Sequence, residues 1–161
     1  MSLYISNLTS MRGHVAAAVV AFASACGVGY AQTPPAEKSL NVQLLEFAKR
    51  GDEMRARNAL DAGAAPDSRN RAGETALYMF AREGRLSAVV LLLERGASVD
   101  LAALNKTTPL MAAAVNGHTE VMRALLNADA DIRAVDQIDK TAADIARESR
   151  HPQVAELLAG S

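Results

Sequence analysis

The side chains best suited to catalysis or metal binding are scarce in this chain of 161 residues, which has three histidines and one cysteine. Histidine and cysteine can act as base, nucleophile or metal ligand, and a metal site needs three or four such ligands that converge. Cys26 and His14 stand in the first thirty residues, while His118 and His151 lie far along the chain, 33 positions apart. No cluster of His, Cys, Asp and Glu has the spacing of a metal site.

A small group of aspartates is the other candidate for chemistry. Asp129, Asp131, Asp136 and Asp139 lie around one expected loop, where oxygen ligands could hold calcium. Solvated loop carboxylates are the simpler interpretation, and we favour it. The sequence has no glycine-rich phosphate loop, nucleophile elbow or pair of catalytic carboxylates. We therefore expect no enzyme activity, no metal and no cofactor.

Certain residue types recur in the chain at a fixed step of 33 positions. The matching columns are Thr75, Thr108 and Thr141; Gly51, Gly84 and Gly117; and Gly63, Gly96 and Asp129. A period of this length is typical of stacked helical units, each too small to bury its apolar face alone. Function should then be sought on a repeated surface rather than in one cleft.

The columns predict four units of two helices each, at about 37–69, 70–102, 103–135 and 136–161. Thr108 followed by Pro109 is a helix start, because the hydroxyl accepts from a free backbone amide and proline fits the first turn. Glycine ends a helix at positive φ with little strain. Apolar residues at steps of one, three and four follow, as in the run that begins at Val89. The prediction is an all-α solenoid with connecting hairpin loops.

Several strings identify a known pattern. The third unit contains Thr108-Pro109-Leu110, Asn116-Gly117-His118, Leu125-Leu126 and Asp129-Ala130-Asp131. These strings resemble the ankyrin repeat, and the resemblance covers about residues 37–161. It implies that the column of His118 and His151 is structural, with the imidazole bonded to nearby backbone.

The chain departs from the ankyrin pattern at some columns. The family's other histidine is replaced by Tyr78, Met111 and Asp144, and Arg150 stands where glycine is expected. The first unit lacks the Thr-Pro start. Since the outer units of a solenoid have one face against water, we interpret units one and four as caps.

The resemblance also implies a binding surface, formed by loop tips and the inward face of each first helix. Its residues would be Arg71, Ala72, Glu74, Arg82 and Glu83; Leu104, Asn105, Thr107, Val115 and Asn116; and Gln137, Ile138, Lys140, Glu148 and Ser149. Interfaces favour apolar side chains beside arginine. Leu104 and Ile138 are therefore our first choices as contact residues, although Leu101 and Leu104 could instead seal the hairpin onto its neighbour.

Composition excludes some partners. The net charge is −1 and aromatic residues make up 4%, so the chain has neither the basic surface nor the stacking side chains of a nucleic-acid-binding protein. Half of the residues are apolar, which is enough for the core of a single domain. We expect a protein partner, no nucleic acid, and a monomer.

The first 31 residues differ from the rest. Residues 15–28 carry no charge, follow Arg12, and precede Ala31, a pattern typical of a secretory signal cleaved after Ala31, with Met11 as a possible true start. The run is too short to span a membrane comfortably, so no span would remain after cleavage. The alternatives are lipidation of Cys26 and a retained apolar arm. Residues 32–38 would be a polar linker before the repeat domain at 39–161.

Taken together, the sequence predicts an ankyrin repeat protein of a bacterial exported type. Its expected role is non-catalytic binding of a periplasmic protein through the concave face and loop tips, as scaffold, inhibitor or protective partner. The alternative is a secreted effector that engages a host protein. Cell fractionation would distinguish the two, because the first role predicts the protein in the periplasm and the second predicts it in the medium or in host cells.

Overall fold

The computed structural model describes residues 39–159, and the expected signal segment, Cys26 and the linker lie outside that range. Within it the chain is all-helical, with no strand and one isolated bridge between Arg69 and Thr75. The helices are α1 (Leu40–Lys49), α2 (Glu53–Asp61), α3 (Ala76–Glu83), α4 (Leu86–Glu94), α5 (Pro109–Val115), α6 (Thr119–Asn127), α7 (Ala142–Glu148) and α8 (Pro152–Ala159). The all-α prediction is confirmed for this part of the chain.

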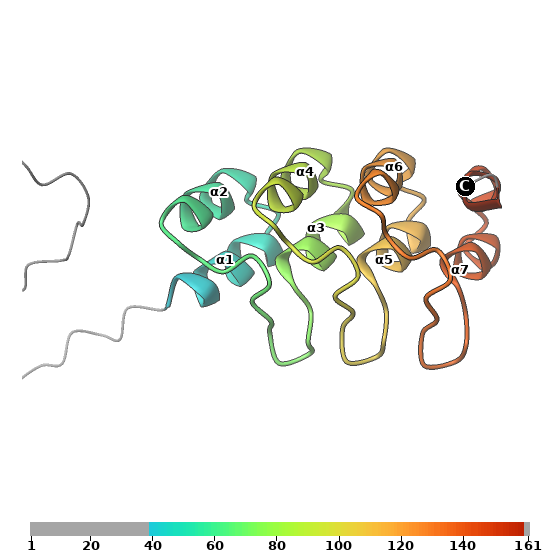
Figure 1. Cartoon of the computed structure of the whole chain (residues 1–161), viewed down its shortest axis with the longest axis horizontal. Helices are drawn as coiled ribbons and strands as arrows, with labels where there is room; N and C mark the ends of the chain where they lie inside the picture. Colours follow the sequence, from blue (N-terminus) through green and yellow to red (C-terminus); the bar gives the residue numbers. More distant parts are fainter. Residues whose placement is uncertain (1–38, 160–161) are drawn as a thin grey trace, which may run out of the picture. The chain divides into compact units, whose positions relative to one another are not determined.

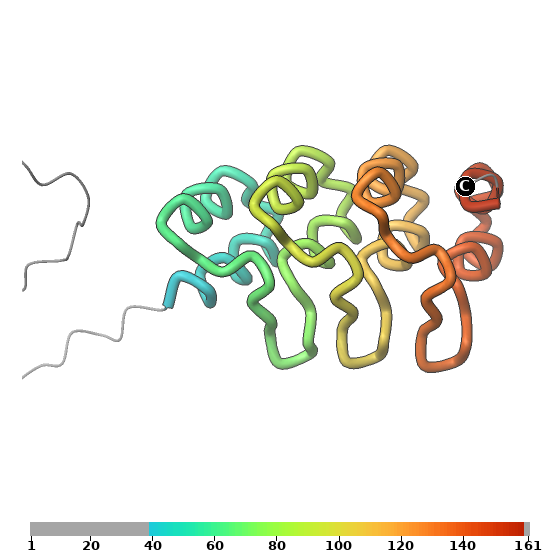
Figure 2. The backbone as a smooth tube through the Cα atoms, in the orientation of Figure 1, coloured from blue at the N-terminus to red at the C-terminus, as the bar shows by residue number. Residues whose placement is uncertain are grey.

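The helices of residues 39–159 are arranged in two rows, with one pair in each predicted unit. Figure 1 shows α1, α3, α5 and α7 side by side in a first row and α2, α4 and α6 in a second row above it. Three long loops, which lead from α2 to α3, from α4 to α5 and from α6 to α7, project on the same side of the stack (Figure 2). The helix pairs are thus repeated side by side, as the period predicts.

Threonine begins the first-row helices of the last three units. The hydroxyls of Thr75, Thr108 and Thr141 accept hydrogen bonds from the backbone amides three residues ahead. Such caps satisfy amides that have no partner within the helix. In the first unit Ser39 takes this place for α1, which explains why that unit folds without a Thr-Pro start.

Left-handed residues end these helices. Gly51, Gly84 and Gly117 have φ of 67°, 73° and 69°. Arg150 occupies the same column in unit four and adopts φ of 62°. The expectation for Asp129 is likewise met, at φ of 62°. The fold therefore imposes the turn even where the residue is not glycine, which costs roughly 1–2 kcal/mol at such positions.

The core runs through the first row. Every residue of α3 from Ala76 to Ala81 is buried, because the helix packs between α1 on one side and α5 on the other. Large side chains such as Phe80 and Leu77 are almost fully inaccessible, and burial of each contributes roughly 1.5–3 kcal/mol. Alanines, including Ala112, Ala113 and Ala114, let neighbouring helices approach closely. The stack is therefore held by contacts between successive units.

Polar groups also link successive units. The His118 ring atom Nε2 lies 3.1 Å from the Arg82 carbonyl oxygen, so this histidine is structural, as the resemblance implies. The Ser98 amide and hydroxyl donate to the Asp67 carboxylate at 2.8 and 2.5 Å. These contacts fix the register of one helix pair against the next.

Candidate protein-interaction surface

At two of the loop tips, a side-chain oxygen accepts hydrogen bonds from the backbone amides of the turn. In the first loop Asn70 Oδ1 accepts from the amides of Ala72 and Glu74 at 2.9 and 3.0 Å. In the third loop Asp136 Oδ1 accepts from the amides of Ile138 and Lys140 at 2.9 and 3.0 Å. Asn70 and Asp136 are 66 positions apart, so the same turn recurs two units later. The first and third tips are thereby held in a defined conformation.

The tips share one left-handed position. Gly73, Lys106 and Asp139 have φ of 74°, 59° and 60° and stand 33 positions apart. Because the three turns share this conformation, the two residues before the left-handed position occupy equivalent places in each loop. The tip pairs are Arg71 and Ala72, Leu104 and Asn105, and Gln137 and Ile138.

A charged pair lies beside the first tip. Arg82 Nη1 is 3.2 Å from Glu74 Oε1, and its guanidinium carbon lies 5.7 Å from the centre of the Tyr78 ring. Burial raises the pKa of the Tyr78 phenol above its ordinary value, and the Glu74 carboxylate adds to the rise, while Arg82 opposes it. Asn70 Nδ2 also donates to Glu74, at 2.7 Å. Glu74 and Arg82 are therefore fixed in position and still partly exposed.

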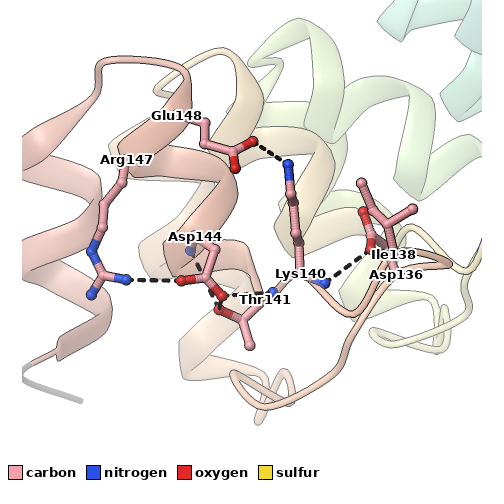
Figure 3. A network of polar contacts seen from close by, with 7 residues as sticks. All are labelled: Asp136, Ile138, Lys140, Thr141, Asp144, Arg147 and Glu148. Carbon is pink, nitrogen blue, oxygen red and sulfur yellow. Dashed lines mark hydrogen bonds and ion pairs between the residues drawn. The ribbon is translucent and has the colours of Figure 1, made fainter.

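The pair beside the third tip has the opposite order of charge. Lys140 Nζ lies 2.5 Å from Glu148 Oε2 (Figure 3), so a cation now stands in the column of Glu74 and an acid in the column of Arg82. In the middle unit the corresponding residues are Thr107 and Val115, which carry no charge. The surface thus has two ion pairs of reversed order, one on each side of the uncharged Thr107 and Val115.

Asp144 also belongs to the network in Figure 3, and its hydrogen bonds stabilise the start of α7. Its carboxylate accepts from the Thr141 hydroxyl at 2.7 Å and from the Thr141 amide at 3.1 Å. Arg147 donates to it at 2.9 Å. The Thr141 side-chain hydrogen bond, followed by its amide and the charge of Arg147, lowers the pKa of Asp144 below its ordinary value.

Apolar side chains lie at the second and third tips and on α5. Leu104 is 67% exposed and Ile138 is 66% exposed, and Val115 on α5 is 44% exposed. Leu104 also contacts its neighbour, because a Cβ added at Gly73 would lie 3.1 Å from Leu104 Cγ, and its amide donates to the Ala72 carbonyl at 3.0 Å. It therefore touches the preceding loop and still presents most of its side chain to solvent. Leu101 is partly buried.

Two residues expected at the surface also join neighbouring units. Asn116 Nδ2 donates to the Arg82 carbonyl at 2.8 Å, and Gln137 Nε2 donates to the Leu104 carbonyl at 3.0 Å. Both side chains therefore bind the preceding unit, in addition to their place on the expected surface. The columns alone could not reveal these bonds, since they depend on how far one unit is displaced from the next.

The remaining expected residues lie at the edges of the surface. Arg71 and Ala72 are exposed at the first tip, and Glu83 pairs with Arg85 at 3.9 Å. Asn105 Oδ1 accepts from the Thr107 amide at 3.1 Å. Ser149 is the C-cap of α7. Sequence reasoning missed Lys106, an exposed cation at the second tip; the available signal was its place 33 positions after Gly73.

Two aspartates of the third loop accept hydrogen bonds from backbone amides. Asp131 Oδ1 accepts from the Arg133 amide at 2.8 Å, and Asp136 caps its tip as described above. Across residues 39–159, no three His, Cys, Asp or Glu side chains are arranged to hold a metal ion. None of the helices of that range has the length and apolar character that a membrane span requires.

Comparison with known proteins places the fold in a family. Residues 44–136 and 100–161 match the family described as Ankyrin repeats (3 copies). The mouse protein named inactive serine/threonine-protein kinase TEX14 is 31% identical over 124 residues, which are 77% of this chain and 8% of that protein. The mouse protein phosphatase 1 regulatory subunit 12A is 35% identical over 109 residues, 65% of this chain and 11% of that protein.

A third relative is the nematode (Caenorhabditis elegans) ankyrin repeat and KH domain-containing protein mask-1. It is 38% identical over 79 residues, which are 49% of this chain and 3% of that protein. The chain thus spans only a small part of the length of the curated relatives it matches, and these relatives are animal proteins. They give no support to a bacterial exported type. On the family match and the repeated geometry, this chain belongs to the ankyrin repeat family.

Proposed function

We propose that the protein is a non-catalytic binding module that holds another protein against its loop tips and the exposed ends of its first-row helices. We call this the partner surface, and it consists of the tip pairs together with Glu74, Arg82, Thr107, Val115, Lys140 and Glu148. Ankyrin repeats serve as protein interaction modules, and one relative is named as a regulatory subunit. The role is that of a scaffold, an inhibitor or a protective partner.

One observation supports the proposal more than any other. Leu104 and Ile138 lie on two successive tips, Leu104 as the first and Ile138 as the second residue of its tip pair, and both are about two-thirds exposed, although the fold gains little from apolar side chains there. The ion pairs on either side are desolvated only if a partner covers them. An apolar centre with a polar rim is the usual composition of a protein interface.

Hydrogen exchange of a captured complex tests the proposal. The partner is isolated by affinity capture with the full chain, identified by mass spectrometry, and purified. Amide exchange of the chain with and without it is then compared peptide by peptide. Protection at the three loop tips, with unchanged exchange in α2, α4 and α6, is the expected result. Protection confined to the second-row helices would contradict the proposal.

We also propose that the protein is exported, on the basis of residues 1–31 alone. Their basic start, uncharged run and small residues before the Ala31–Gln32 bond support a cleaved signal. Cell fractionation with mass measurement of the N-terminus tests this: a mature chain beginning at Gln32 is expected. A chain that retains Met1 or Met11 would contradict it, and a lipid on Cys26 would establish the anchored alternative. Recovery from host cells would favour the effector role.

A further inference from the structure

The helix α4 is apolar on two sides. Most of its residues from Leu86 to Leu93 are apolar, and Val89 and Leu92 are buried against the stack. The opposite side presents Leu86 and Val90, which are 40% and 38% exposed. A helix that is apolar all round is normally covered on all sides. Within residues 39–159 this outer side of α4 is only partly covered.

The repeat itself shows that the fold does not require these residues. At the position of Leu86 the other units have Glu53, Thr119 and Pro152. At the position of Val90 they have Arg57, Arg123 and Glu156. The same backbone is therefore built with polar or charged side chains elsewhere, and the apolar outer side is particular to α4.

A groove follows this side of α4 along α2. Two adjoining hollows of about 290 and 550 Å³ share Arg57, Ser87 and Leu91 in their walls. Met54, which is 75% exposed, lines the first, and Leu86 and Val90 line the second. Both hollows are open to solvent, so together they form a shallow apolar groove rather than a closed ligand pocket.

Opposite charges stand on the two helices that form the groove. Arg57 on α2 and Glu94 on α4 both line the second hollow. Neighbouring charges are already engaged: Glu53 with Arg85 and Ser87, and Asp61 with Arg95. Among the ion pairs of residues 39–159, neither Arg57 nor Glu94 takes part. The groove therefore carries one unengaged cation on one helix and one unengaged anion on the other.

We propose that the groove is the contact between two copies of this chain. A two-fold contact uses the same patch on both copies and so must be complementary to itself. A two-fold axis through the second hollow brings the α2 side of one copy toward the α4 side of the other. Arg57 of each copy then faces Glu94 of its partner across the apolar side chains. This dimer replaces the monomer expected from the sequence.

The dimer goes beyond the proposed function and does not depend on it. The groove lies on the second row of helices, whereas the partner surface lies on the loop tips and first row (Figure 1). Both partner surfaces of a dimer would stay open. A ligand with two binding sites would be held by both copies and would gain affinity through linkage.

Sedimentation velocity of the full chain over a wide concentration range tests the contact. We expect reversible dimers, because the apolar patch is small. The matched variant carries Leu86→Thr with Val90→Arg, which gives α4 the residues that α6 has at Thr119 and Arg123. Its dimer dissociation constant should rise at least about tenfold. The control Leu104→Thr, at a loop tip, should leave association unchanged.

Exchanging the two charges tests whether Arg57 of one copy faces Glu94 of the other. Arg57→Glu and Glu94→Arg should each weaken association, because like charges then face each other, and the double variant should restore it. Thermal unfolding of each variant checks that the fold is intact. A wild-type chain that stays monomeric at every concentration overturns the proposal. So does a dimer that the α4 variant leaves unchanged, or a double variant as weak as the single ones.

Discussion

The imidazole of His118 lies directly against the α carbon of Gly84. A Cβ built at Gly84 would come within 2.6 Å of the His118 ring, and a Cβ at Gly117 would come equally close to His151. The glycine of one unit therefore makes room for the histidine of the next. Since His118 also bonds the Arg82 carbonyl, glycine and histidine together fix the spacing between helix pairs.

Gly84→Ala should destabilise the protein more than Gly96→Ala. Both glycines have positive φ, 73° and 81°, but a Cβ at Gly96 meets open space. Gly96→Ala should therefore cost only the left-handed strain of roughly 1–2 kcal/mol. Gly84→Ala adds the clash with the ring, and its loss of unfolding free energy in urea should be about twice as large. Equal losses would mean that the ring moves aside freely.

Gly117→Val should be more damaging still. A β-branched side chain resists positive φ and would also collide with the His151 ring. The expected loss exceeds about 2 kcal/mol of unfolding free energy. Urea titration followed by circular dichroism measures it. A variant of unchanged stability would contradict the role assigned to this column.

Arg150→Gly should stabilise the last unit. Arg150 stands at φ of 62° in the glycine column, so glycine removes strain there, although it also increases the entropy of the unfolded chain. The net gain should be about 0.5–1 kcal/mol. Arg150→Ala is the control, because alanine keeps the strain and should bring no gain. A gain of the same size with alanine would show that the arginine side chain, not its backbone, is the cause.

The fold could be predicted from the sequence because its requirements repeat. The threonine and glycine columns specify where helices begin and end, and three such columns at one spacing leave few alternatives. The column of Arg150 shows the limit of this reasoning: the sequence shows that glycine is missing there, but not that the residue adopts the same positive φ. Units one and four are expected to cap the stack. That role depends on their outer faces, about which the repeated columns give no information.

Stability should depend on pH through Asp144. Its folded-state pKa is lowered below the ordinary 3.8, so the ionised carboxylate favours the folded state. This contribution is complete at neutral pH, and it declines as the pH falls below 3.8 and through the folded-state value. Asp144→Asn should lower the urea midpoint at neutral pH, and the difference from wild type should vanish in acid. A difference that persists unchanged in acid would contradict this origin.

Glu74→Gln should leave stability nearly unchanged. The Glu74–Arg82 pair is partly exposed, and such pairs contribute about 0–1 kcal/mol. Partner affinity should change instead, because the substitution leaves Arg82 without its acid at the proposed interface. Titration calorimetry with the captured partner measures this, and Arg123→Gln on α6 serves as the control. A large drop in the unfolding midpoint with unaltered affinity would assign the pair to the fold.

The partner surface was only partly predictable. The columns located the loop tips, but they could not show that Asn116 and Gln137 bond the preceding unit, because that depends on the displacement between units. They also could not show that Glu74 pairs with Arg82 and Lys140 with Glu148, since each pair joins residues on a loop and a helix. The outer side of α4 was overlooked because core packing accounts for most of its apolar residues.

The central claim is that the loop tips bind another protein, and the double variant Leu104→Asp with Ile138→Asp tests it most directly. Both side chains are about two-thirds exposed, so their loss should shift the unfolding free energy by no more than about 0.5 kcal/mol. Capture of the partner should be abolished, while the control Met54→Asp on α2 captures it as the wild type does. Undiminished capture by a folded double variant, or a collapse of its thermal midpoint, would contradict the claim.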